Sequence, residues 1–292
     1  MNNRAGTKLS TTIVSAKCAD APWNAFDDVE VFAEAAAAEI KAMRGESPTL
    51  RRPGPREAMD DATQRRILIT VWTVCFGGMQ WRTAAFHTSL PFGTLFAFFQ
   101  RWTRRGLWKR LLGKALKVWR LACGNTEEPS VVAIDSRSCR SAPTCGFHGI
   151  DGGKKVRGLK LHLAVDKHGF PLAIHVTEAN VHDSKAAVVV VEKLSAAGFS
   201  GSMVGDSAYA GPKLAAIGAS HGIDVVSMKC GAGKTFVPRE IRWVVERSFA
   251  WLSRYRRLNT IFDRTTESLV GFAELAMASI LHRRLSRLDS EA

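Results

Sequence analysis

Residues 159–177 read LKLHLAVDKHGFPLAIHVT, and this stretch decides the fold class. Its first half places leucine or valine at every second position from 159 to 165, which is the period of a β-strand with one apolar face. The run at 172–177 repeats the alternation, and the residues at 167–171, KHGFP, are typical of a hairpin connection. A short β-rich run, SVVAI at 130–134, precedes this pair. We therefore predict three antiparallel strands.

The chain after this hairpin alternates helical and extended patterns. We expect a helix at 184–197, a strand at 201–204, a helix at 212–221, a strand at 224–228 and a long helix at 239–258. Three consecutive strands at the start favour a mixed sheet flanked by helices over a uniformly parallel sheet. Residues 126–292 are thus predicted to form one α/β domain.

The first 125 residues show helical rather than alternating patterns. Residues 1–60 combine a helix with an apolar stripe from Val29 to Met43 and a linker, SPTLRRPGPRE, at 47–57. Residues 61–125 read as short basic helices around tight turns. Such helices are compatible with a helix-turn-helix DNA reader, with Arg101, Arg104 and Arg105 as candidate contacts. A small helical bundle with a solvated basic face fits the spacing equally well.

Charge narrows the class of protein. The chain carries 41 Lys and Arg against 27 Asp and Glu, a net charge of +14, and residues 1–60 hold only 8 of the basic and 9 of the acidic residues. The excess in the remainder suits a phosphate backbone, although a merely basic soluble enzyme would show it too. An apolar fraction of 46% excludes a disordered chain. We find no stretch suited to a membrane span or a secretory signal, and we expect a cytoplasmic protein.

Three acids lie where such a domain could use them. Asp135 directly follows the strand at 130–134, Asp206 follows the strand at 201–204, and Glu246 lies in the long helix. On a helical wheel Arg239, Arg242, Ser253 and Arg257 all fall within about 40° of Glu246. Oxygen ligands from two strand ends and one helix suit Mg²⁺, and paired ions assist phosphodiester displacement. Taken singly, each acid has an ordinary alternative as a turn former or a surface ion pair.

Several blocks of this sequence resemble a known family. They are AIDSRS at 133–138, VRGLKLHLAVD at 156–166, EANVHDSK at 178–185, GDSAY at 205–209 and RWVVERSFAWLSRYRRL at 242–258. In this order they resemble the DDE-type transposases of bacterial insertion sequences, in the group whose ribonuclease-H-like catalytic domain is uninterrupted. The resemblance covers about residues 81–285.

The resemblance implies a function and a site. Asp135, Asp206 and Glu246 would be the catalytic and metal-binding triad, with Mg²⁺ or Mn²⁺, two ions, as cofactor. The reaction would nick the end of the element with water and then join the freed 3′-hydroxyl to target DNA. The partners would be double-stranded DNA, as terminal inverted repeats and target, and further copies of the chain assembled on it. No membrane and no small-molecule substrate are implied.

The DNA contacts follow the family pattern less closely. Arg242 matches the family's arginine four residues before the Glu, but Arg239 stands where one version of the motif has Tyr. Position 253 is Ser where a basic residue is expected, with Arg254 and Arg257 as nearby substitutes. Lys154 and Lys155 lie in a glycine-rich loop suited to a DNA backbone or to a plain surface.

Two further residues, His182 and Asp183, belong to a block that matches the family. His182 could contact DNA or simply pack, and Asp183 is favoured as the N-cap of the helix that follows it. Two rival functions also fit this sequence. One is a transposase-derived DNA-binding protein without catalysis, and the other is a metal-dependent nuclease without strand transfer.

Overall fold

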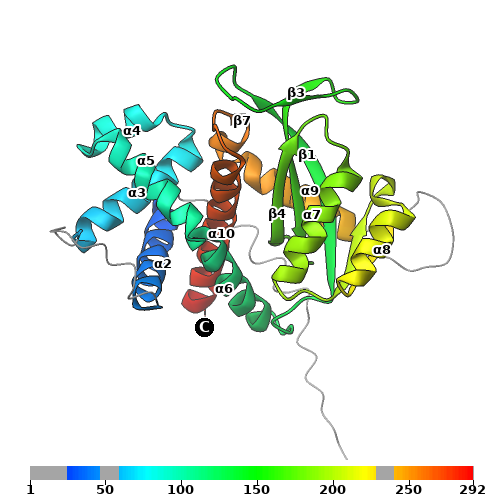
Figure 1. The fold of residues 1–292 in the computed structure, drawn as a ribbon. Coiled ribbons are helices and arrows are strands. Elements are labelled where there is room, and N and C mark those ends of the chain that lie inside the picture. Colours follow the sequence, from blue (N-terminus) through cyan, green and yellow to red (C-terminus); the bar gives the residue numbers. More distant parts are fainter. Residues whose placement is uncertain (1–24, 47–58, 228–239, 292) are drawn as a thin grey trace, which may run out of the picture.

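The structure, a computed structural model, describes residues 25–46, 59–227 and 240–291. Its helices form two groups around one mixed sheet (Figure 1). One group contains α2 (Ala25–Glu46), α3 (Asp61–Gly77), α4 (Trp81–Thr88), α5 (Phe92–Arg104), α6 (Leu107–Ala122) and α10 (Thr266–Glu291). The other contains α7 (Asp183–Ala196) and α8 (Pro212–Ser220), and α9 (Glu240–Ser253) packs on the opposite face of the sheet from these two, in the same apolar cluster as the first group. Within these ranges no helix is both long and apolar enough to cross a membrane.

The sheet has seven strands and a mixed direction. They are β1 (Val131–Ser141), β2 (Gly149–Asp151), β3 (Val156–Val165), β4 (Pro171–Glu178), β5 (Gly201–Gly205), β6 (Ile223–Ser227) and β7 (Thr260–Ile261). The path runs β2-β3-β1-β5-β6, with β4 paired to β3 and β7 paired to β1. β1 is antiparallel to β3 and parallel to β5. The predicted mixed sheet flanked by helices is therefore confirmed.

The two faces of the sheet are covered by different helices. One face packs with α9 and the helical layer, where Leu161 and Leu163 of β3 meet Phe249 and Leu252 of α9. The other face packs under α7 and α8, where Ile134 of β1 belongs to a second, smaller apolar cluster. Because β3 is covered on both faces, residues 158–165 are all buried.

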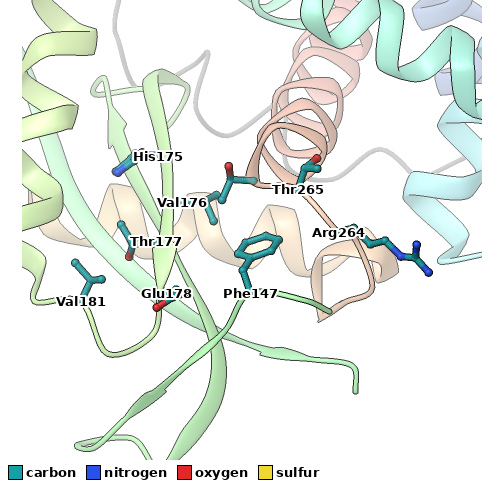
Figure 2. A pocket seen from close by; sticks show the side chains of 9 residues that line it. Phe147, His175, Val176, Thr177, Glu178, Val181, Arg264 and Thr265 are labelled. Carbon is teal, nitrogen blue, oxygen red and sulfur yellow. The ribbon is translucent and has the colours of Figure 1, made fainter. Parts of the chain in front are cut away.

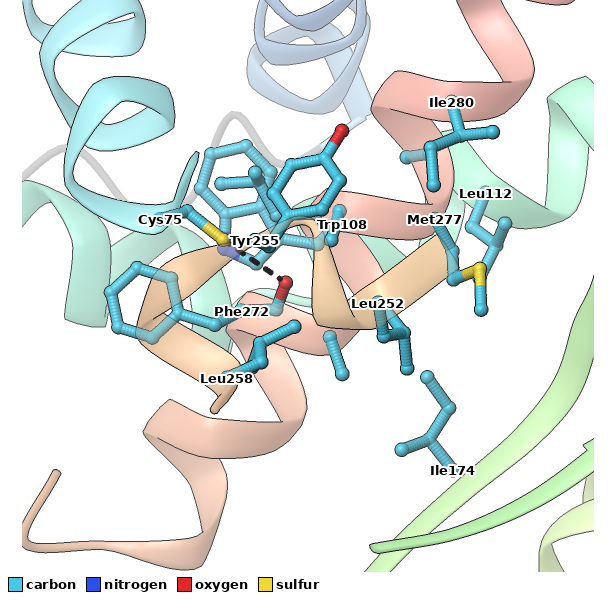
Figure 3. Close-up of a cluster of buried hydrophobic side chains, with 14 of the residues drawn as sticks. Cys75, Trp108, Leu112, Ile174, Leu252, Tyr255, Leu258, Phe272, Met277 and Ile280 are labelled. Carbon is cyan, nitrogen blue, oxygen red and sulfur yellow. Dashed lines mark hydrogen bonds between the residues drawn. The ribbon is translucent and has the colours of Figure 1, made fainter. Parts of the chain in front are cut away.

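Helix α10 connects the helical layer to the sheet. Figure 1 shows it between α2 and β4, and its buried apolar residues belong to the same cluster as those of α2, α3 and α6. Figure 3 shows the centre of this cluster, where the Cys75 thiol of α3 donates to the Phe272 carbonyl of α10 over 3.5 Å. The Trp72 indole N–H donates to Ser279 Oγ over 2.7 Å nearby. Residues on both sides of the boundaries predicted at 60 and 125 therefore belong to one apolar core.

Most predicted elements exist with shifted ends. The hairpin strands, the helices after them and the stripe of α2 lie where their periodicity indicated. The helix predicted at 239–258 ends at Ser253 and is followed by a 3₁₀ turn, Arg256–Leu258. The pattern missed the short strands β2 and β7 and the helix α10, whose apolar residues run almost around its circumference. The predicted linker at 47–57 lies outside the described residues.

A cavity of about 240 Å³ lies between α6, β4, α7 and α10. Most of its lining is apolar, but the carboxyl of Glu274 and the ammonium groups of Lys109 and Lys193 also face it. Lys193 Nζ donates to the Ile174 carbonyl over 2.7 Å. Burial raises the pKa of Glu274 to about 7, against the opposing influence of the two lysines. Glu274 is therefore an acid that the fold stabilises in its neutral form.

The raised pKa of Glu274 predicts a dependence of stability on pH. Because the folded value of about 7 exceeds the ordinary pKa of 4.5, the stabilisation is complete below 4.5 and is lost as pH rises through 7. Glu274→Gln should remove this loss, which amounts to at most about 3 kcal/mol at 1.36 kcal/mol per pKa unit. Urea unfolding at about pH 5 and about pH 8 would show a variant-minus-wild-type difference that grows with pH. Glu267→Gln, at an exposed position of α10, is the control, and an equal difference at both pH values would contradict the prediction.

Candidate active site

Asp135 and Asp206 occupy equivalent positions on two adjacent strands. Ala133 of β1 pairs with Val204 of β5 in parallel register, and each acid follows its strand partner by two residues. The two acids therefore lie side by side on the face that α9 covers, Asp135 within β1 and Asp206 directly after the end of β5. The prediction that Asp135 follows the end of its strand was wrong, because β1 continues along β3 to Ser141. Both are partly exposed. Asp135 Oδ1 accepts from the Ser136 amide over 2.7 Å, and Asp206 Oδ1 accepts from the Ala208 amide over 2.9 Å.

Helix α9 brings Glu246 to the same face. Arg137, two residues beyond Asp135 on β1, donates from Nη1 to the carbonyl of Phe249 over 3.2 Å. Phe249 lies one turn after Glu246, so this contact aligns the middle of α9 with the segment of β1 that carries Asp135. In the same part of the helix, Ser248 Oγ donates to the Gly169 carbonyl over 2.7 Å. Glu246 itself is exposed.

These three acids do not close a complete ligand set. Among the side chains that the structure describes, no three of His, Cys, Asp or Glu are close enough together to hold a metal ion. The arrangement instead offers two neighbouring carboxylates, one within β1 and one directly after β5, and a third on α9, which packs against β1. Carboxylate oxygens are the ligand type that Mg²⁺ and Mn²⁺ take in proteins.

The start of α7 differs from the expectation for Asp183. The N-cap of this helix is His182, whose Nδ1 accepts from the Ser184 amide over 3.2 Å. Asp183 is the first helical residue, and its Oδ1 accepts instead from Ser136 Oγ over 3.0 Å. The cap assigned to Asp183 was therefore wrong by one residue. Its carboxylate turns toward β1 because the polar residues of the sheet lie there.

Tyr209 is buried on the α7 side of the sheet, near these acids. Its side chain is 1% exposed and belongs to the smaller apolar cluster with Ile134, and its ring lies against Gly205. Burial raises the pKa of Tyr209 far above its usual value, and the carboxylates of Asp183, Asp135 and Asp206 raise it further. The hydroxyl is therefore a neutral group close to three carboxylates.

The structure places the exposed residues predicted to contact DNA in different parts of the surface. Arg101, Arg104 and Arg105 are exposed at the end of α5, and Lys154 and Lys155 are exposed in the turn between β2 and β3. Arg254 is also exposed, just after α9. Arg239 lies outside the described residues, and Arg242 is described only as part of the helical backbone.

Arg257 has a different environment. It is 6% exposed, and its guanidinium binds the Asp263 carboxylate through two hydrogen bonds of 2.9 and 3.2 Å. The same guanidinium lies 5.6 Å from the ring centroids of Phe262 and Phe272. An arginine buried in an ion pair is not available to phosphates, so the DNA contact predicted for Arg257 is corrected to a role in packing.

A larger hollow lies away from the acids. It has a volume of about 560 Å³ and opens between the outer strand β4 and the segment that leads into α10 (Figure 2). Phe147, Val176 and Arg264 are among its lining residues, and none of the predicted site residues that the structure describes lines it. This hollow and the candidate site formed by β1, the end of β5 and α9 are therefore separate features of the surface.

Sequence reasoning missed the polar residues beneath the acids. Ser136, Lys160 and His162 lie on the α7 face of β1 and β3, where burial leaves them 9% exposed or less. A signal for two of them is present in LKLHLAV at 159–165, where Lys160 and His162 occupy the alternate face of a strand bounded by apolar residues. Polar residues at both positions indicate that this face meets charged partners.

Comparison with known proteins places the sheet region in a family. The family model described as "Transposase DDE domain" matches residues 126–229. A protein from Burkholderia cepacia, named as a candidate transposase for insertion sequence element IS402, is 30% identical over 146 residues, which are 45% of this chain and 66% of that protein. A second, from Brucella ovis, is named as a candidate transposase for insertion sequence element IS6501. It is 31% identical over 127 residues, which are 41% of this chain and 95% of that protein.

The close packing of Tyr209 predicts the cost of a small substitution. A Cβ atom at Gly205 would stand 2.5 Å from Tyr209 Cδ2 and 2.9 Å from Ile134 Cγ2. Gly205→Ala should therefore lower the free energy of unfolding by about 1–3 kcal/mol, measured by urea denaturation. Gly113→Ala in α6 is the matched control, because a Cβ there meets nothing within 4 Å. It should raise stability by about 0.5–1 kcal/mol, and equal effects of the two changes would refute the packing argument.

Proposed function

Because this chain belongs to the DDE-type transposases of insertion sequences, we propose that it binds the terminal inverted repeats of its element and catalyses cleavage and strand transfer there. Asp135, Asp206 and Glu246 are the catalytic acids in this proposal. The observation that carries it is the parallel register of β1 and β5, which brings the first two acids side by side under the helix that contains the third.

The strand arrangement supports a ribonuclease-H-like assignment for the sheet. The central strand β1 is antiparallel to β3 on one side, and β3 is in turn antiparallel to β4. On the other side β1 is parallel to β5, which is parallel to β6. The acids occupy the central strand, the next parallel strand and the covering helix. This placement leaves their carboxylates at an open surface, where a DNA duplex can approach.

The donor set fits divalent cations. Asp135, Asp206 and Glu246 would hold Mg²⁺ or Mn²⁺, two ions in our proposal, because hard cations take carboxylate oxygens. Such ions, when bound, activate an attacking oxygen and stabilise the leaving oxygen of a phosphodiester. The chain orients the first two carboxylates through the amides of Ser136 and Ala208. Glu246 projects from the polar side of α9, whose apolar side is buried in the core.

Helices α4 and α5 support a helix-turn-helix reading of the DNA-binding region. They are joined by only three residues, 89–91, which is the connection length of that motif. Phe92 and Gly93 at the start of α5 are exposed, as the base-contacting end of a recognition helix must be. Arg101, Arg104 and Arg105 at its other end would bind phosphates. A DNA-associated homo-oligomer in the bacterial cytoplasm completes the proposal.

The catalytic proposal predicts a separation of binding from chemistry. Asp135→Asn, Asp206→Asn and Glu246→Gln should each lower cleavage and joining by roughly 10³-fold or more, since each removes a negative charge that holds the cations. Binding to the duplex should persist in all three variants. The measurement uses a labelled duplex that carries the ends of the element, with Mg²⁺ or Mn²⁺. Asp224→Asn, an exposed carboxylate on the neighbouring strand β6, is the matched control and should leave activity unchanged.

The outcomes distinguish the rival functions. A wild-type protein that binds the ends but neither cuts nor joins would be a transposase-derived DNA-binding protein. A protein that cuts but cannot join a precut 3′-end to target DNA would be a nuclease. Equal cleavage by wild type and by the three acid variants would refute the assignment of the acids.

The DNA-binding proposal predicts a change in salt dependence. Substituting alanine for Arg101, Arg104 and Arg105 together should weaken binding to any duplex. It should also reduce the slope of log K against log salt by about 0.9 for each phosphate that the variant no longer neutralises. Titrations of a fluorescent duplex over a range of salt concentrations measure both effects. Lys41→Ala, at an exposed position of α2, is the control, and an unchanged slope in the triple variant would place the DNA elsewhere.

A further inference from the structure

A layer of polar side chains lies on the α7 face of the sheet, directly beyond the smaller apolar cluster. In one cross-strand row Ser136 pairs with His162, which pairs with His175. In the next row Ser138 pairs with Lys160, which pairs with Thr177. The apolar cluster ends at Ile134, Ala164 and Ala173, one row earlier. On its α7 face the sheet therefore changes from apolar to polar side chains at the row that contains Ser136, the neighbour of Asp135.

Asp183 forms an ion pair with a lysine of this polar layer. Its Oδ1 lies 3.3 Å from Lys160 Nζ, which also donates to the Val181 carbonyl over 3.0 Å. His162 Nδ1 is 4.0 Å from the same oxygen, but burial lowers the pKa of His162 to about 4, so the ring is neutral at pH 7. Lys160 is therefore the cation that compensates Asp183.

Ser136 is fixed from both sides of the sheet. Its hydroxyl donates to Asp183 Oδ1 over 3.0 Å on the α7 face, and its amide donates to Asp135 Oδ1 over 2.7 Å. Because successive side chains of a strand point to opposite faces, Asp135 and Ser136 lie on different sides of β1. The pair of hydrogen bonds thus connects the start of α7, through the strand, to the acid on the α9 face.

We propose that Asp183 is a positioning residue for the site: by holding the Ser136 hydroxyl it fixes the strand segment whose amide orients the Asp135 carboxylate. This inference rests on the proposed function, because it assigns Asp135 to cation binding. A group that orients a metal ligand from outside the ligand set alters metal affinity by about 10–100-fold when it is removed. The side chain that accepts from the Ser184 amide at the start of α7 is His182 and not Asp183, so the Asp183 carboxylate is not the cap of this helix.

The test measures Mn²⁺ binding to the whole chain without DNA, by electron paramagnetic resonance of the free ion. Ser136→Ala and Asp183→Ala should each weaken binding by about 10–100-fold. Both changes break the same hydrogen bond. The double variant should therefore bind Mn²⁺ no less tightly than the single variant with the lower affinity. Asp183→Asn should keep most of the affinity, since its amide oxygen still accepts from Ser136. The same order should appear in the Mn²⁺ concentration that gives half-maximal cleavage.

Asp151 provides a matched control. Its Oδ2 accepts from Ser138 Oγ over 2.6 Å, so a second serine of β1 holds a carboxylate in the same way, one row away. Because Ser138 lies three residues from Asp135 rather than next to it, Asp151→Ala should leave Mn²⁺ affinity unchanged. His182→Ala, which removes the cap of α7, should lower stability without changing Mn²⁺ affinity.

Each outcome separates this inference from the proposed function. Wild-type affinity in Ser136→Ala and Asp183→Ala, together with loss of binding in Asp135→Ala, would overturn the positioning role alone. Multiplicative losses in the double variant would also overturn it, as would equal losses in Asp183→Asn and Asp183→Ala. Unchanged binding in Asp135→Ala would instead refute the proposed function. If Asp183→Ala fails to fold, Ser136→Ala and Asp183→Asn still decide the question.

Discussion

The central position of β1 is the constraint on which the rest of the structure depends. It pairs with β3 over eight residues, from Ala133 to Arg140, and with β5 over three. Because the strand is paired on both edges and covered on both faces, its alternation assigns every side chain to one environment. A shift of one residue would exchange Asp135 with Ser136 and move the acid into the polar layer under α7. The register of β1 therefore decides which acid faces the covering helix.

A buried ion pair ties the helical layer to this sheet. Arg120 of α6 is 4% exposed, and its Nη1 lies 2.7 Å from Asp166 Oδ2, in the turn between β3 and β4. The other carboxylate oxygen of Asp166 accepts from the amides of His168 and Phe170. Removing one partner of such a pair leaves an uncompensated buried charge, typically at a cost of about 3–5 kcal/mol. The helices and the sheet therefore form one folding unit, although residues 1–125 show a helical sequence pattern and the later residues show strands alternating with helices.

The sequence predicted the sheet well because its signals are local. Alternation identified β3 and β4, and the strand-helix order identified the α7 to β6 region. Residues whose environment depends on distant partners were harder to predict. Arg120 and Arg257 look like members of a basic surface, yet both are buried with an aspartate that no periodicity links to them. Asp183 reads as a helix cap for the same reason, since its partner Ser136 lies 47 residues away.

Three aspartates, Asp135, Asp183 and Asp206, all raise the pKa of Tyr209, and the ammonium group of Lys160 lies against Asp183. Like charges at short range destabilise each other, so the proximity of Asp135, Asp183 and Asp206 must be offset by other contacts. Lys160 compensates Asp183 on the α7 face. Backbone amides orient Asp135 and Asp206, and an amide fixes a carboxylate without cancelling its charge. Lys160 thus offsets the charge of Asp183, the acid that positions the strand in our proposal. In the proposed function, a divalent cation held by Asp135 and Asp206 would add the positive charge that offsets the repulsion between these two neighbouring carboxylates.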